Sequence, residues 1–338
     1  MIRIPPGSPD PGLPAARGDL SAWVLDALTG VPPAPPPTGT EDPLGDDDLH
    51  LALYLCYELH YRELPGVSDR MEWAPELLRI RGALESAFEQ ALMGSVPRRP
   101  VAPVDVRDRL REVTDPGARD PFTVYVEREA TLEQAREFLI HRSAYQLKEA
   151  DPHTWAIPRL RGAAKTAVVE VQYDEYGSGD PAWMHSELFR TTMAAAGLDP
   201  TDGAYVALLP GRTLATVNLI SLFGLHRRWR GALVGHLAAF EMTSSIPNRH
   251  LANGFRRLGF DRTATRFFEE HVEADAVHEI LACDGASALA AEESSMAADI
   301  VFGAEALDLL SGRWSETILD AWRAGRSSLR LDQPALAR

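Results

Sequence analysis

Cysteine, long apolar runs and net positive charge are all scarce or missing in this chain of 338 residues. The two cysteines, Cys56 and Cys283, are too few and too far apart for a disulfide framework or a zinc ribbon. No apolar run approaches the length of a membrane span, and the N-terminus lacks a basic stretch followed by an apolar one. The formal net charge of −15 argues against nucleic acids and anionic membranes as partners. We therefore expect a soluble protein of the cytoplasm.

Strand patterns and several catalytic motifs are also lacking. Residues 123–127 are the best candidate for a β-strand, and they form only a short run. Residues 177–179 read Gly-Ser-Gly but do not form a phosphate-binding loop, because no strand precedes them and no Lys-Ser/Thr pair follows. Residues 278–282 begin with His-Glu but lack the second histidine of a zinc-hydrolase helix. These absences favour an all-α protein whose chemistry lies elsewhere in the chain.

Proline is concentrated at the N-terminus, where residues 1–43 hold eleven of the twenty-five prolines. Residues 32–37 read Pro-Pro-Ala-Pro-Pro-Pro, which cannot keep a helical hydrogen-bond ladder. We expect residues 1–43 to be extended or disordered, except for a short docking helix at 20–28.

Residues 44–120 predict an N-terminal helical pair followed by a linker. The first helix is expected at 49–63, after acidic residues that suit a helix start, and it is apolar on most sides. The second is expected at 75–93, and the Pro- and Arg-rich residues 97–120 are interpreted as a linker. This pair is interpreted as an auxiliary or dimerisation unit.

Residues 121–330 predict an all-α bundle of about seven helices, followed by a tail at 331–338. Caps, glycines and prolines set the expected boundaries. The expected helices are 131–149, 160–176, 182–196, 214–245, 248–258, 263–283, 288–312 and 313–324, and 214–245 is expected to be one long or gently broken helix.

His271, Asp275 and His278 form the most informative pattern. Their stretch contains no Gly or Pro, and at about 100° per residue the three side chains fall within about 60° on one helical face. Two imidazoles and a carboxylate suit Fe(II), Mn(II) or Zn(II), and open coordination positions would point to non-haem iron and O₂. The alternative is a polar outer face whose histidines pair with nearby acids.

Four further residues are candidate ligands, because an unpaired acid inside an apolar helix is costly to bury. Glu241 is the only acid in a long apolar run. Glu175 and His185 are ten residues apart, about 80° on an unbroken helix, and a kink at 177–181 could turn both inward. Glu149 lies at a predicted helix end. Each of them has an alternative as a surface residue.

Seven residues together carry a resemblance to a known family. They are Glu149, Glu175, His185, Glu241, His271, Asp275 and His278. Through these residues the chain resembles the haem-oxygenase-like di-iron oxidases, often described as iron-containing redox enzymes. The sequence segments around them, at 174–177, 184–185, 239–245 and 270–278, are also similar to that family. The resemblance covers about residues 130–329, and the helix expected at 49–63 is similar to the N-terminal part of larger members.

The resemblance implies a haem-oxygenase-like fold and two iron ions as cofactors. The wide Glu175–His185 spacing and the additional Glu149 resemble the branch that N-oxygenates amines and amino acids. The resemblance to this branch implies that Glu149 binds the same iron as His271, Asp275 and His278. Glu175 and His185 would hold the other iron, and Glu241 would bridge the two.

The function implied is O₂ activation through a peroxo-diferric intermediate and N-oxygenation of a small amine or amino acid, in a biosynthetic pathway. The di-iron centre itself would be the catalytic group. An external electron donor is expected because no flavin or nicotinamide site is evident, and a homodimer is expected. The alternatives are C–H abstraction at the same site, giving desaturation or C–C cleavage, and a non-catalytic metal- or ligand-binding bundle.

Two related folds match less well. Ferritin-like proteins repeat Glu-x-x-His on two helices, which this sequence does not. A haem oxygenase proper would need an axial histidine on an early helix. His141 could take that place but would leave the carboxylate set unexplained.

The substrate-binding candidates are Arg227, Arg228 and Tyr173. Either arginine could hold a substrate carboxylate through a bidentate contact, although a solvated, salt-bridged helix face is the alternative. Tyr173 and Trp183 could line a pocket near the glycine break, and core packing is their alternative.

Overall fold

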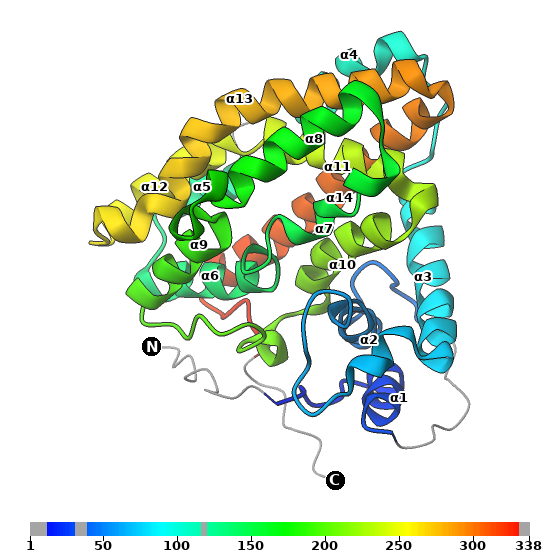
Figure 1. Ribbon diagram of the computed structural model, residues 1–338. Helices are drawn as coiled ribbons and strands as arrows, with labels where there is room; N and C mark the ends of the chain where they lie inside the picture. The colour runs from blue at the N-terminus through cyan, green and yellow to red at the C-terminus, as the bar shows by residue number, and fades with distance from the viewer. Residues whose placement is uncertain (1–11, 31–38, 116–119, 331–338) are drawn as a thin grey trace.

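The computed structural model describes residues 12–30, 39–115 and 120–330, and in these ranges the chain is helical without a β-strand (Figure 1). The proline run at 32–37 and the tail at 331–338 lie outside the described residues. The α-helices are α1 (Asp19–Leu28), α2 (Asp47–Glu58), α3 (Pro75–Ser95), α4 (Val106–Thr114), α5 (Pro121–Arg128), α6 (Leu132–Gln146), α7 (Asp151–Thr154), α8 (Gly162–Glu175), α9 (His185–Ala195), α10 (Gly211–Leu225), α11 (Arg230–Met242), α12 (Ser245–Arg257), α13 (Arg262–Glu292) and α14 (Ala297–Arg323).

The centre of the bundle is built on α11, which contacts both long helices, α13 and α14. The backbones of α11 and α14 approach closely at two glycines. A Cβ atom on Gly235 would collide with the Ile300 carbonyl, and one on Gly303 would collide with the Ala232 carbonyl. Helix α8 runs alongside α13 and contacts it (Figure 1). The glycine pair therefore sets the close spacing of α11 and α14, and α13 packs against α11 and in turn contacts α8.

The N-terminal helices pack against the rest of the chain through α2, which contacts α1, α3 and α10. The Asp46 side chain caps α2 by accepting from the Leu49 amide at 2.7 Å. Buried side chains of α1 to α3 belong to the same hydrophobic cluster as those of α10 and α14. A dimerisation role for residues 44–120 stays a prediction.

Two segments differ from their expected structure. Residues 106–114, expected in a linker, form α4, whose Val106 and Leu110 are fully buried against α13 and α14. Their four-residue spacing is the apolar stripe of a helix, which the neighbouring prolines and arginines concealed. Residues 123–127, the best strand candidate, lie inside α5. Asp120 caps that helix by accepting from the Phe122 and Thr123 amides, and this cap outweighs the β-branched residues.

The bundle also has more helices than the seven expected, because residues 121–330 form ten α-helices, α5 to α14. The helix expected at 214–245 is divided where His226 adopts an extended conformation, with φ −104° and ψ 114°. The helices expected at 288–312 and 313–324 are instead one helix, α14, which Gly312 does not interrupt. A helical glycine is unfavourable by only about 1 kcal/mol, which packing readily offsets.

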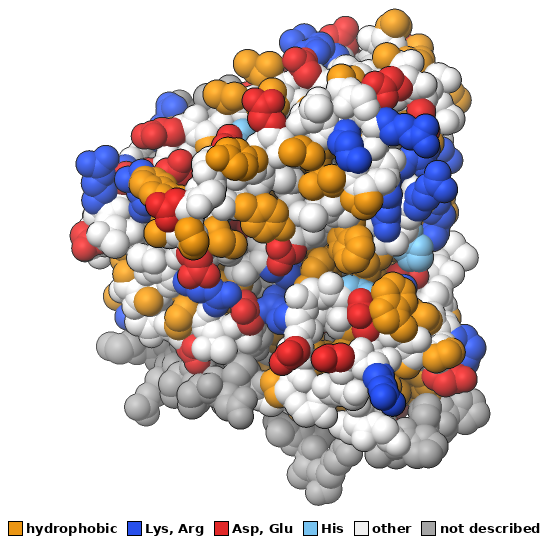
Figure 2. Space-filling view, viewed as in Figure 1, with side chains coloured by type: hydrophobic (Ala, Val, Ile, Leu, Met, Phe, Trp, Pro, Cys, Tyr) orange, Lys and Arg blue, Asp and Glu red, His pale blue; other side chains and the backbone are white. Residues whose placement is uncertain are grey.

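The outer face of α8 and α13 mixes hydrophobic side chains with acidic and basic ones, as Figure 2 shows. The exposed hydrophobic residues of these helices are Val169, Tyr173, Val277 and Ile280. Within the described ranges, no helix combines the length and the apolar character that a membrane span requires.

Candidate metal centre

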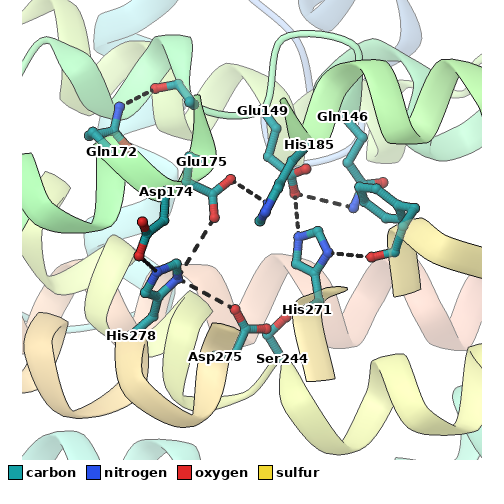
Figure 3. Close-up of polar contacts among 12 residues, drawn as sticks. Gln146, Glu149, Gln172, Asp174, Glu175, His185, Ser244, His271, Asp275 and His278 are labelled. Atoms are coloured by element: carbon teal, nitrogen blue, oxygen red, sulfur yellow. Dashed lines mark hydrogen bonds and ion pairs between the residues drawn. The ribbon is translucent and has the colours of Figure 1, made fainter. Parts of the chain in front are cut away.

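The seven residues singled out from the sequence come together in the interior. Each of them is at most 7% exposed, although all are acids or histidines. They come from α8, α9, α11, α13 and the turn that follows α6. Figure 3 shows six of them around one centre, and these are Glu149, Glu175, His185, His271, Asp275 and His278. Buried charges of this kind normally require partners of opposite charge or a metal ion.

The ligand atoms fall into two groups, each within 4.8 Å of one another. The first contains Glu149, Glu175, His185 and His271, and the second contains Glu175, Glu241 and His278. Asp275 borders the second group, with Oδ1 at 3.7 Å from Nδ1 of His278. This grouping differs from the expected one, because His271 and His278 lie in different groups and Glu175 is shared by both.

Several of these buried atoms have no hydrogen-bond partner. They are Oε2 of Glu149, Oε2 of Glu175, Nδ1 of His185, both carboxylate oxygens of Asp275 and Nδ1 of His278. Nδ1 of His185 and Oε2 of Glu175 lie 2.9 Å apart, yet they are not aligned for a hydrogen bond. Unpartnered buried N and O atoms that converge from three helices and a turn fit divalent cations with mixed carboxylate and imidazole ligands, such as iron.

Two histidines of the cluster are oriented by contacts outside it. Nδ1–H of His271 donates to the Phe267 carbonyl at 2.7 Å, so Nε2 is left facing Glu149 at 3.5 Å. Nε2–H of His278 donates to Oδ2 of Asp174 at 3.2 Å, so Nδ1 is left facing Glu241 at 3.5 Å. Such outer contacts fix the tautomer of a metal-binding imidazole. The orienting role of Asp174 was not predicted from the sequence.

Burial and mutual contacts shift the pKa values of three groups in the cluster. Burial lowers the pKa of His278, but its contacts with Asp275 and Glu241 outweigh burial and raise the pKa to about 11. Burial raises the pKa of Glu241 to about 8. Burial also acts to raise the pKa of Glu175, but the charges of His185 and His271 lower it to about 2. A bound cation would replace the protons on the groups whose pKa is raised.

The meeting of Glu175 and His185 depends on the break between α8 and α9. Helix α8 ends at Glu175, two short 3₁₀ turns follow, and α9 begins at His185. Gly177 has φ +78°, and a Cβ there would lie 2.6 Å from the Met184 amide nitrogen. The chain therefore folds back on itself at a position where only glycine fits. The kink expected from the sequence is a full break.

The turn that carries Glu149 contacts α2, one of the N-terminal helices. Lys148, the neighbour of Glu149, is buried and forms an ion pair with Glu58 of α2, which is also buried. Arg62 contacts the other oxygen of Glu58 at 2.7 Å and also pairs with Asp202 at 2.6 Å. Helix α2 therefore supports the turn that carries Glu149.

Two sizeable cavities within the described residues border the cluster. The larger has a volume of about 1020 Å³ and is lined by Glu149 and His271 together with Arg142, Phe240 and Trp314. The smaller, of about 220 Å³, is lined by Glu149 and Glu175 together with Tyr61 and Lys148. The cluster thus lies beside a cavity large enough for a small molecule.

The substrate-binding candidates from the sequence line neither cavity. Arg227 and Arg228 are exposed on the short turn before α11, and Arg228 pairs with Glu89 at 2.5 Å. Tyr173 is 58% exposed and donates to the Ser178 carbonyl at 2.8 Å. Trp183 stacks with Arg266, whose Cζ lies 4.1 Å from the ring centroid.

His141 is engaged by the protein at both ring nitrogens. Nδ1 lies 2.7 Å from Oγ1 of Thr213, and Nε2 lies 3.0 Å from Oγ of Ser328. It is therefore a satisfied core histidine with no nitrogen left for a haem iron.

Comparisons with known proteins agree with this geometry. A model of a family described as iron-containing redox enzyme matches residues 136–311, just over half of the chain, and all seven clustered residues lie in that range. A nitrosourea synthase of Streptomyces achromogenes subsp. streptozoticus is 27% identical over 144 residues. The match covers 43% of this chain and 31% of that protein, so the chain spans less than a third of the relative's length.

Proposed function

Because the chain belongs to the iron-containing redox enzymes, an oxidoreductase family with a haem-oxygenase-like all-α fold, we propose that it is a di-iron oxygenase that oxidises a nitrogen atom of a small amine or amino acid. The observation that carries the proposal is the cluster of seven buried residues beside a cavity of about 1020 Å³. Six of them form the two groups of ligand atoms, and Asp275 borders the second group. A lone metal would leave several of these donors unpartnered.

Glu149, His185 and His271 would hold one ion, Glu241, His278 and the adjacent Asp275 would hold the second, and Glu175 would contact both. Two iron ions bound in this way would supply the electrons that reduce O₂ to the oxidant. For insertion of one oxygen atom into an N–H bond, the second oxygen atom leaves as water. That balance needs two electrons and two protons, and an external reductant would deliver the electrons.

The protein's own residues prepare the site in three ways. The Phe267 carbonyl and Asp174 hold the imidazoles of His271 and His278 in the tautomers that leave one nitrogen free. The ligand side chains themselves are buried, which strengthens the electrostatic contacts among them. The larger cavity meets the cluster at Glu149 and His271, so a substrate there would approach the first ion.

The choice of nitrogen as the oxidised atom rests on the likeness to nitrosourea synthase. The name of that protein describes a product with a nitroso group, in which a nitrogen atom is bonded to oxygen. C–H abstraction on the same cluster would give a desaturated or fragmented product instead. The two reactions can be distinguished by the fate of the oxygen atoms of O₂. N-oxygenation leaves one of them on the nitrogen of the product, whereas desaturation leaves none in the product.

The test is a reaction of the Fe(II)-loaded protein with ¹⁸O₂ and a chemical reductant, against a panel of amines and amino acids. We expect O₂ uptake above the substrate-free rate and a product that carries ¹⁸O on nitrogen. Glu241→Ala should abolish both, whereas Glu170→Gln, an exposed acid on α8, should not. Products without ¹⁸O, or with a new C=C bond, would refute N-oxygenation, and absence of O₂ uptake would refute the oxygenase assignment.

A further inference from the structure

Arg142 is a charged residue in the wall of the larger cavity, near the cluster. It lies on α6, and its guanidinium carbon is 5.7 Å from the ring centroid of Tyr145 and 5.8 Å from that of Trp314. Both distances are within the range of a cation–π contact. The two rings restrict where the guanidinium can move.

Among the described residues, no carboxylate lies within ion-pair distance of the guanidinium, and its only hydrogen bond is from Nε to Oε1 of Gln146 at 2.9 Å. The two terminal nitrogens are therefore left available to the cavity. Burial lowers the pKa of Arg142, and Glu149 opposes this. An arginine stays charged nonetheless. Arg142 is only partly exposed, and a partly buried cation without a counter-ion is costly, which favours an anionic ligand.

Arg142 is also connected to the cluster. Oε1 of Gln146 accepts the hydrogen bond from Arg142. Nε2 of the same Gln146 donates to Oε1 of Glu149 at 3.5 Å, a contact that Figure 3 shows. An anion held by Arg142 would thus lie in the same cavity as the first ion, without competing for its ligands. Arg128 also lines this cavity, but it is exposed at the end of α5.

We infer that Arg142 binds the carboxylate of the substrate, and that the substrate is an amino acid rather than a simple amine. The inference rests on the proposed function, because it takes this cavity as the substrate site. The planar guanidinium offers two parallel N–H donors to a carboxylate, which is the geometry that arginine recognises best. Arg142 rather than Arg227 or Arg228 is then the residue that sets specificity.

The test measures binding, so it does not depend on turnover. Fe(II)-loaded protein is titrated anaerobically, by calorimetry, with pairs of ligands that differ only by a carboxylate. The pairs are L-lysine and cadaverine, L-arginine and agmatine, L-leucine and 3-methylbutylamine, and L-phenylalanine and phenethylamine. At least one amino acid should bind about ten- to a hundredfold more tightly than its amine, which is the usual worth of a charged hydrogen bond.

Arg142→Gln should remove this preference and leave binding of the amine unchanged, because only the carboxylate contact is lost. Arg142→Lys should restore part of it, since a point charge replaces the bidentate fork. Arg128→Gln removes a charge from the same cavity and should keep the full preference. Circular dichroism confirms that each variant is folded.

Three results would overturn the inference: amines that bind as well as their amino acids, a preference that survives Arg142→Gln, or no saturable binding of any amino acid in the panel. The proposed function can be rejected independently of this inference. A carboxylate preference that depends on Arg142, in a protein that takes up no O₂, would keep the anion site and reject the oxygenase.

Discussion

Asp174 and His278 form a contact that determines which nitrogen of His278 faces the cluster. Oδ2 of Asp174 lies 3.2 Å from Nε2 of His278, and Nδ1 on the other side of the ring is left without a hydrogen-bond partner. Asp174 is half-exposed at the end of α8, one residue before Glu175. An acid at the surface therefore orients a fully buried ligand.

Asp174→Ala should lower the affinity for Fe(II) about ten- to a hundredfold, because loss of an outer partner typically costs that much. The affinity is measured anaerobically by competition with a metal-binding dye. Glu170→Ala removes another acid from α8, one that is exposed, and serves as the control. Equal affinities for the Asp174 and Glu170 variants would show that His278 is oriented without Asp174.

Gly177→Ala should remove metal mainly from the first group. The added Cβ would press on the Met184 amide and displace the turn that joins Glu175 to His185. Gly179→Ala is the matched variant, because it also has a positive φ but only the Tyr173 hydroxyl within 4 Å, at 3.9 Å. We expect about one Fe(II) per chain for Gly177→Ala, with Gly179→Ala closer to the wild type. Equal loss of both ions in both variants would contradict a local effect of the turn.

Glu58→Ala should lower the free energy of unfolding by about 3–5 kcal/mol, because it leaves Lys148 buried without its partner. Arg62 would keep its contact with Asp202. The double variant Glu58→Met with Lys148→Met should recover most of the loss, since an apolar pair replaces a buried ion pair. Urea unfolding of the wild type, Glu58→Met, Lys148→Met and the double variant gives the coupling energy. Additive losses would mean that the pair does not join α2 to the turn carrying Glu149.

His50 should make the protein sensitive to acid. Burial lowers its pKa to about 4, against the opposing contact of its Nε2 with the Pro43 carbonyl at 3.1 Å. A folded pKa below the unfolded value of about 6.5 means that the stabilisation is present above pH 6.5 and is lost as the pH falls towards 4. At pH 5 the loss from this group should be about 2 kcal/mol.

The check is urea unfolding of the wild type and His50→Gln at pH 7 and pH 5. The glutamine variant should lose less stability between the two pH values, by about the same 2 kcal/mol. The comparison between proteins cancels the titration of the metal cluster, which both share. An identical drop in both would show that His50 does not take up a proton on unfolding.

The sequence was sufficient to predict the parts of the site that depend on one helix. His271, Asp275 and His278 share a face because helical periodicity places them there, and α13 indeed runs without a break from Arg262 to Glu292. The division of the ligands into two groups could not be predicted. It depends on the angle between α8 and α13 and on how the chain returns at Gly177, which are properties of packing.

Arg142 shows the same limit. An arginine on a helix usually keeps its charged end in solvent, and nothing near Arg142 in the sequence marks it as different. Its position in the cavity wall depends on Trp314 of α14, which is distant in the chain. The basic run around Arg227 and Arg228 drew more attention in the sequence, yet the fold places it on the surface. Local charge density was a poor guide, because the cavity is formed by residues from seven different helices and their connections.

The most direct test of the central claim is an anaerobic Fe(II) titration followed by Mössbauer spectroscopy and then by mixing with O₂. The account predicts two bound irons per chain, in two distinct ligand environments, and oxidation of both when O₂ is added. One iron or fewer per chain, with no O₂ consumed, would contradict a two-metal oxygenase and would leave the cluster as a binding site for another cation.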